Sequence, residues 1–132
     1  MKKTKSSKAI IVKNDRILLV NKKQGNRSYY LLPGGDLNKS ENPDEALVRE
    51  IKRETNLDVV SFKKFTEIED DNRYCYYYFV DRYIGEIKIG TQNVLSKSII
   101  NQHELEWIKN KDLRKINLKP IQIKERLVNY LT

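Results

Sequence analysis

Two glutamates that could bind a metal ion, Glu50 and Glu54, stand four residues apart in the stretch PGGDLNKSENPDEALVREIKRETNL, which runs from Pro33 to Leu57. On a helix, side chains at this spacing are neighbours, and two like charges there repel each other by about 0.2–0.5 kcal/mol. A hard divalent cation removes that repulsion, because Mg²⁺ and Ca²⁺ prefer carboxylate and carbonyl oxygens. The pair therefore points to a metal site, provided that a helix carries it.

The residues around the pair contain the signals of a helix. Asn42 is a good N-cap, Pro43 follows at the first helical position, and Glu45 stands three residues after the cap. The helix is predicted to run to about Thr55, where Asn56 is suited to a left-handed ending. Its apolar side is formed by Leu47, Val48 and Ile51.

At 100° per residue, both glutamates fall on the edge of this apolar side, beside the loop of Gly34 and Gly35. A glycine backbone can approach a ligand closely, and its carbonyl is a further oxygen ligand. A second interpretation stays open at this point. The helix could be an ordinary amphipathic one, in which Arg53 and Glu50 form a weak surface ion pair.

The remaining elements are predicted from turns and apolar runs. We expect a hairpin over 8–23 around Asn14-Asp15, a strand over 28–33, two long strands over 58–69 and 73–85, and a strand over 103–108. A helical turn over 110–116 and an amphipathic helix over 119–131 follow. The outcome is an α/β fold in which one mixed sheet is flanked by helices.

Length and composition fit a single domain over 1–132, with a flexible tail over 1–7. No apolar run approaches the roughly 18 residues of a membrane span, and the first ten residues lack the apolar stretch of a signal peptide. One cysteine, Cys75, excludes an internal disulfide and fits the cytoplasm. Cys75 and the single His103 do not make a zinc site of the usual type.

The net charge of +8 favours anionic partners without choosing among them. The basic residues are spread over several elements, as on any lysine-rich solvated surface. We expect a small-molecule nucleotide as the partner, hold nucleic acid as a less favoured possibility, and expect no membrane partner. Monomer and homodimer both stay open.

Taken as a spaced pattern, the segment resembles the Nudix box, G-x5-E-x7-R-E-U-x-E-E-x-G-U, where U is a bulky apolar residue. Seven of the nine fixed positions match: Gly35, Glu41, Arg49, Glu50, Ile51, Glu54 and Leu57. Two positions differ from the pattern: Arg53 stands in place of the first glutamate of the E-E pair, and Asn56 stands in place of the glycine. The flanking segments YYLLPGG and LEWI-KDL also resemble the family, which implies a Nudix-type α/β/α sandwich with a mixed, curved sheet.

The resemblance implies a hydrolase that cleaves the pyrophosphate link of a nucleoside diphosphate joined to a further group. By position, Glu50 and Glu54 hold Mg²⁺, with Mn²⁺ as a substitute, and the Gly35 carbonyl lies nearby. Arg49 orients the glutamates by ion pairing, and Glu41 supports it. Catalysis of this kind depends on positioning and charge neutralisation.

Family members often add a carboxylate from a later segment, as a ligand or as the base. Glu104 is the first candidate for this role and Glu106 the second. The candidate substrate contacts are Gly34, Arg53, Tyr74, Tyr76 and Glu106. Strand tyrosines more often pack than stack on a base, so the two tyrosines keep both interpretations.

Three hypotheses about function follow. The leading one is a cytoplasmic, Mg²⁺-dependent hydrolase of nucleoside triphosphates or dinucleoside polyphosphates. The second, motivated by Arg53, is a catalytically weak nucleotide-binding Nudix module. The third, motivated by the charge of +8, is an RNA 5′-end pyrophosphohydrolase.

Overall fold

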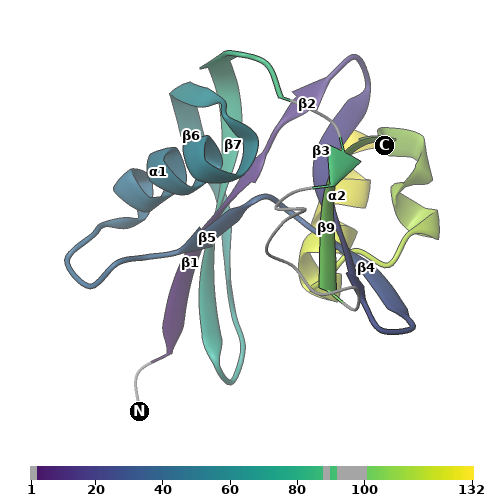
Figure 1. The fold of residues 1–132 in the computed structure, drawn as a ribbon, viewed down its shortest axis with the longest axis horizontal. Coiled ribbons are helices and arrows are strands. Elements are labelled where there is room, and N and C mark those ends of the chain that lie inside the picture. The colour runs from purple at the N-terminus through teal and green to yellow at the C-terminus, as the bar shows by residue number, and fades with distance from the viewer. Residues whose placement is uncertain (1–2, 88–89, 92–100) are drawn as a thin grey trace. The chain divides into compact units, whose positions relative to one another are not determined.

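The computed structural model describes residues 3–87, 90–91 and 101–132 (Figure 1). The strands in these ranges are β1 Thr4–Ile10, β2 Val12–Lys13, β3 Arg16–Gln24, β4 Arg27–Leu31, β5 Gly34–Asp36, β6 Asp58–Glu69, β7 Arg73–Ile84, β8 Gly90–Thr91 and β9 Asn101–Lys109. The helices are α1 Pro43–Thr55, the 3-10 helix η1 Asn110–Lys115 and α2 Ile121–Leu131. No helix in the described ranges is long and apolar enough to cross a membrane.

The chain divides into two compact units. Unit 1 comprises Met1–Ile11 and Pro33–Ile87, and unit 2 comprises Val12–Leu32 and Lys88–Thr132. The single domain expected over 1–132 stays a prediction.

Unit 1 is a mixed sheet with the strand order β5-β1-β7-β6, against which α1 packs (Figure 1). β1 runs parallel to β7 and antiparallel to β5, while β6 and β7 form a long antiparallel hairpin. Fully or almost fully buried apolar side chains from both layers form its core: Ala9, Ile10, Leu47, Ile51, Leu57, Tyr77 and Val80. The helix is therefore held by the sheet over its apolar side.

Unit 2 is an antiparallel sheet in which β3 pairs with β9 on one side and with β2 and β4 on the other. β8 pairs with the free side of β9. α2 packs against η1, and the core is formed by Ile17, Leu18, Leu19, Leu105, Leu113, Leu118, Ile123 and Leu127.

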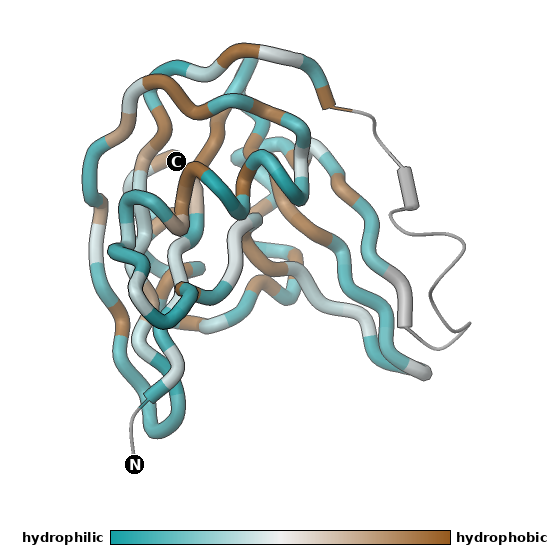
Figure 2. Tube along the Cα trace, turned by 60° about the vertical axis from the view of Figure 1, so that its left-hand side comes forward, coloured by the Kyte–Doolittle hydropathy of each residue, from teal (hydrophilic) through white to brown (hydrophobic). Residues whose placement is uncertain are grey.

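Both ends of α1 form as their sequence predicts. The side chain of Asn42 accepts a hydrogen bond from the Glu45 amide, and the Glu45 carboxylate accepts one from the Asn42 amide. Asn56 ends the helix in the left-handed region at φ 68°, and its amide donates to the Lys52 carbonyl. The hydrophilic and hydrophobic segments that alternate along α1 are visible in Figure 2.

The α/β class with a mixed sheet and flanking helices is confirmed; the described strands form two sheets, of which that of unit 1 is mixed. The short hairpin expected around Asn14-Asp15 is present, but its first strand begins at Val12 and not at residue 8, because residues 4–10 belong to the other sheet. Asn14 and Asp15 do form the expected turn, with φ 52° and 61°, but it joins only β2 to β3. The chain leaves one sheet for the other at Ile11, between β1 and β2.

The flexible tail over 1–7 is wrong from Thr4 onward, since these residues belong to β1. Ser6 and Ser7 are fully buried. Their hydroxyls donate to the Asp36 carboxylate and to the Pro43 carbonyl, both at 2.7 Å. A polar segment is buried here because its polar groups find partners.

Asn56 gives a test of the helix ending. Asn56→Ala should lower the free energy of unfolding by about 1 kcal/mol, because the left-handed conformation is less favourable for alanine than for asparagine. Asn56→Gly should change it by only a few tenths of a kcal/mol or raise it. Urea unfolding of the three proteins measures the difference; equal stability of the alanine and glycine variants would contradict this account.

Candidate active site

The candidate site is built on two glycines that allow very close contacts. A Cβ on Gly35 would lie 2.5 Å from the Cδ atom of Glu50, so the carboxylate keeps this position only beside a glycine. Gly34 has φ +143°, and a Cβ there would lie 2.1 Å from the Ser7 carbonyl oxygen. Glycine is thus required at Gly34 by contact with backbone and by conformation, whereas a side chain at Gly35 would displace the Glu50 carboxylate.

Glu50 lies between two guanidinium groups. Its side chain is buried, and Arg49 Nη1 donates to Oε1 at 2.7 Å. Arg53 Nε donates to Oε2 at 2.7 Å, with Arg53 Nη2 at 2.6 Å from the same oxygen. These hydrogen bonds to Glu50 raise the pKa of the Arg53 guanidinium. The Arg53–Glu50 pair considered from the sequence is therefore present.

Arg49 joins three parts of the site. Besides Glu50, it binds both carboxylate oxygens of Glu41, at 2.7 and 2.8 Å, and donates to the Asp36 carbonyl. Glu41 also accepts from the Asn38 amide. The hydrogen bonds from Arg49 hold the pKa of Glu41 at about 2, so Glu41 is ionised over the physiological range. A bidentate, charge-assisted pair of this kind fixes orientation as well as position.

Glu54 accepts a hydrogen bond from the Gly34 amide at 2.8 Å. Burial raises the pKa of Glu54, and the Gly34 hydrogen bond and the nearby charges of Lys8 and Arg53 oppose that rise. Sequence reasoning missed Lys8. Burial lowers the pKa of Lys8, and the nearby Glu54 carboxylate only partly opposes this effect. A charged residue immediately before the apolar run from Ala9 was the available signal.

The donors of this site fit a small hard cation. Glu50 and Glu54 supply carboxylate oxygens from α1, and Gly35 offers a carbonyl beside Glu50. In the described part of the chain, no group of three or more His, Cys, Asp or Glu side chains forms a metal cage. Mg²⁺ needs no such cage, because it keeps several waters and takes its other oxygens from substrate phosphates.

The structure groups most of the predicted site residues in unit 1. Contacts described above connect Gly34, Gly35, Glu41, Arg49, Glu50, Arg53 and Glu54. Tyr74 and Tyr76 are placed differently: their rings lie 5.0 Å apart, and the Tyr74 hydroxyl donates to Glu67. Among the described contacts, none joins either tyrosine to Glu50 or Glu54. Their substrate role stays a prediction.

Glu104 and Glu106 lie two residues apart on β9 of unit 2. Glu106 accepts from Asn21 Nδ2 at 2.6 Å and from the Tyr30 hydroxyl at 3.3 Å. Burial and the Glu106 carboxylate raise the pKa of Tyr30. The sequence did not single out this network, although Asn21 and Tyr30 are the polar members of two otherwise apolar runs. The roles of both glutamates stay predictions.

The carboxylates of α1 thus lie against two glycines of β5, at the edge of the mixed sheet, as the resemblance to the Nudix box implies. The NUDIX domain model matches residues 3–127, so the chain belongs to this family. It is a Nudix pyrophosphohydrolase, a class that hydrolyses the pyrophosphate link of nucleoside diphosphate derivatives.

Solved structures share the fold at low sequence identity. A MutT NUDIX hydrolase from Burkholderia pseudomallei is 19% identical, with a TM-score of 0.75 over 97% of this chain and 99% of that one. A structure from a study of MutT from Aliivibrio salmonicida and Vibrio cholerae is 17% identical, with a TM-score of 0.74 over 98% and 99%. A MutT protein from Bacillus halodurans is 20% identical, with a TM-score of 0.71 over 97% and 82%. Among curated proteins, none matches.

The Glu41–Arg49 pair predicts a pH-dependent stability. Because the folded pKa of Glu41, about 2, lies below its ordinary value of 4.5, the pair stabilises the protein above pH 4.5 and loses this effect as the pH falls toward 2. Glu41→Gln should therefore be less stable than the wild type at pH 7, and the difference should shrink between pH 4.5 and 2. Urea unfolding at several pH values measures it.

The control is the same substitution in an Arg49→Gln background, where Glu41 has lost its partner. The pH dependence of the difference should disappear there. A difference that persists unchanged in that background would show that Arg49 is not its cause.

Proposed function

We propose that this chain is an Mg²⁺-dependent hydrolase of nucleoside triphosphates or dinucleoside polyphosphates, with Mn²⁺ as a substitute for Mg²⁺. The observation that carries the proposal is the placement of Glu50 and Glu54 against Gly34 and Gly35 of β5. We also propose that it acts in the cytoplasm on a small-molecule nucleotide, because its one cysteine is free and its net charge is positive.

The residues of α1 and the glycine loop have separable roles in this proposal. Glu50, Glu54 and the Gly35 carbonyl would hold Mg²⁺, which when bound neutralises phosphate charge and acidifies the attacking water. Arg49 keeps the Glu50 carboxylate turned toward the loop, and Glu41 keeps Arg49 in place. Arg49 and Glu41 are therefore positioning residues.

Arg53 has a different role, because its side chain is 59% exposed while its partner Glu50 is buried. A guanidinium there is free to turn from Glu50 toward a substrate phosphate, which it binds with two parallel N–H donors. Arg53 would thus leave one oxygen of Glu50 when the substrate and cation arrive. We propose Glu104 as the base or further ligand, and Glu106 as a substrate contact.

A metal-dependent screen over nucleoside triphosphates, dinucleoside polyphosphates, nucleotide sugars and 5′-triphosphate RNA tests the proposal. Glu54→Gln should lower kcat/KM on the best substrate by at least about a hundredfold, since it removes a charged ligand near the developing charge. Glu45→Gln is the matched control on the same helix: glutamine keeps the capping box, so activity should be retained. Turnover by the wild type no higher than that of Glu54→Gln would refute the proposal.

A second candidate function is a nucleotide-binding module without turnover. It is favoured by one observation, that both carboxylate oxygens of Glu50 are already bound by arginines. A ligand that binds only the native state stabilises that state by mass action. A nucleotide would then raise the melting temperature of the protein without being hydrolysed.

Arg53 gives a test of the feature that favours the second function, and this test does not depend on turnover. Arg53→Gln should tighten Mg²⁺ binding by up to about fivefold, because a largely exposed ion pair is worth up to about 1 kcal/mol. Isothermal titration with Mg²⁺ and Mn²⁺ measures this. Lys52→Gln is the control, since Lys52 carries the same charge on the same helix but pairs with Asp58. Equal affinities in all three proteins would show that Arg53 does not compete with the cation.

A further inference from the structure

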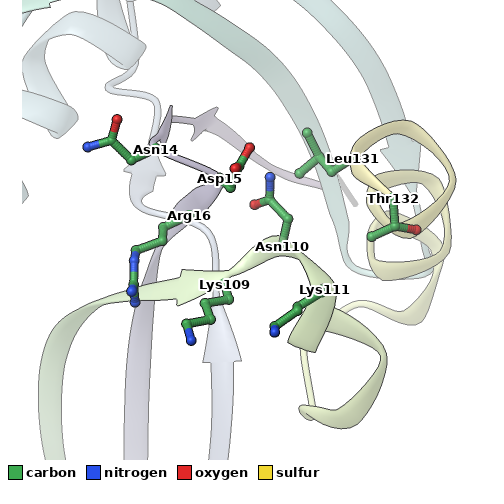
Figure 3. A pocket seen from close by; sticks show the side chains of 8 residues that line it. All are labelled: Asn14, Asp15, Arg16, Lys109, Asn110, Lys111, Leu131 and Thr132. Atoms are coloured by element: carbon green, nitrogen blue, oxygen red, sulfur yellow. The ribbon is translucent and has the colours of Figure 1, made fainter.

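Unit 2 contains a cavity of about 540 Å³ that involves none of the residues proposed for catalysis (Figure 3). It lies where the β2–β3 turn, the end of β9, the start of η1 and the end of α2 meet. Its lining residues are Asn14, Asp15, Arg16, Lys109, Asn110, Lys111, Leu131 and Thr132. Cavities of about 300–1,000 Å³ are the size range of small-molecule sites.

Cations stand opposite one another in the sheet at this cavity. Arg16 on β3 is the direct register partner of Lys109 on β9 and also of Lys13 on β2. Like charges directly opposite each other destabilise a sheet. Within the described residues, no ion pair is formed by any of the three, although the chain forms exposed pairs elsewhere. The arrangement therefore costs stability that a bound anion would restore.

The cationic side of the cavity also includes Lys111, two residues beyond Lys109. In Figure 3, Arg16 and Lys109 extend to the same side. The one acidic side chain of the lining, Asp15, points away from that side. Three cationic side chains against one acidic side chain give the lining side chains a net positive charge. Guanidinium and ammonium donors bind the oxygens of carboxylate and phosphate groups, and a phosphate monoester carries the larger negative charge of the two.

A second, independent feature points to a ligand with hydrogen-bond donors. The side-chain Oδ1 atom of Asn110 is buried and has no hydrogen-bond partner. The backbone N–H of the same residue, by contrast, donates to the Asp15 carbonyl at 2.9 Å. Buried polar atoms without a partner are rare and require an explanation. Because Oδ1 has almost no solvent-exposed surface, a ligand hydroxyl or N–H supplies the missing partner only when the Asn110 side chain turns Oδ1 into the cavity.

The wall contributed by α2 has the same preference. Leu131 and Thr132 belong to the carboxyl end of this helix, where the last carbonyl groups lack helical partners and the helix dipole is negative. This wall favours ligand donors and disfavours an anion. The cavity is therefore polarised, with the anion side on the strands and the donor side at Asn110 and α2.

We propose that this cavity binds a nucleoside monophosphate. The phosphate contacts Arg16, Lys109 and Lys111, and the ribose hydroxyls or base N–H groups donate to Asn110 Oδ1 and to the end of α2. The polarity of the cavity matches a ligand that is anionic at one end and rich in donors at the other. The proposal does not rest on the proposed catalytic function.

The experiment is a titration of the full chain with AMP, inorganic phosphate and ribose, in EDTA and at constant ionic strength. Amide resonances of Asp15, Arg16 and Asn110 report this cavity by NMR, and those of Gly34 and Gly35 report the catalytic loop. AMP should shift the first set and bind more tightly than phosphate, and ribose alone should not bind measurably. Shifts confined to the glycine loop, or equal affinity for AMP and phosphate, would overturn the proposal.

Variants separate binding from a structural role. Arg16→Gln/Lys109→Gln should weaken AMP binding by at least about tenfold. Without ligand and at low salt, the same variant should melt at an equal or higher temperature, because repulsion is relieved. The matched control, Arg114→Gln/Lys124→Gln, removes the same two charges from unit 2 outside the cavity and should bind AMP as the wild type does. An equal loss in both double variants would show only a general effect of charge.

Asn110→Leu tests the donor side. Because Oδ1 has no partner in the protein, the substitution should leave the melting temperature without ligand within a few degrees of the wild type. It should weaken AMP binding severalfold and leave phosphate binding unchanged. Unchanged AMP affinity would remove Asn110 from the site and contradict the assigned polarity.

Discussion

The absence of a side chain at Gly35 is the constraint on which the rest of the site depends. The Glu50 carboxylate occupies the space where a Cβ would lie, which brings α1 against β5 and buries a charged group to 7% exposure. A buried carboxylate is tolerated only when its oxygens are bound, and Arg49 and Arg53 bind both of them. Arg49 then connects this contact to Glu41 and to the loop before the helix.

The parts of the molecule that were predictable from the sequence are those specified by neighbouring residues. Both ends of α1 follow from Asn42, Glu45 and Asn56, and the β6–β7 hairpin follows from two long apolar runs around a polar turn. Pairing between distant segments was not predictable in this way. An apolar run such as 9–12 does not indicate that it divides at Ile11, because its first part pairs in parallel with β7, more than sixty residues later.

Within the site, the sequence predicted which charged residues are spaced so that they can meet, but not the direction in which each side chain points. The sequence places Glu50 and Glu54 at the edge of the apolar side of the helix, with Arg49 further round. The structure brings the two glutamates to the glycines of β5, and Arg49 binds Glu50. The sequence did not indicate whether Arg53 faces solvent or Glu50, because both directions are open to a long exposed side chain on a helix. Lys8 and the Asn21–Tyr30–Glu106 network were missed because they depend on packing between strands.

The central claim is that two carboxylates of α1, the arginine-bound Glu50 and Glu54 bound by the Gly34 amide, form a divalent cation site at the two glycines of β5. Paramagnetic broadening by Mn²⁺ tests it most directly, because the effect falls steeply with distance from the ion and needs no substrate. At substoichiometric Mn²⁺, the amide resonances of Gly34, Gly35 and α1 residues near Glu50 and Glu54 should broaden first, and a Glu50→Gln/Glu54→Gln protein should lose this pattern. Broadening that is spread over exposed carboxylates, or unchanged in the double variant, would contradict the claim.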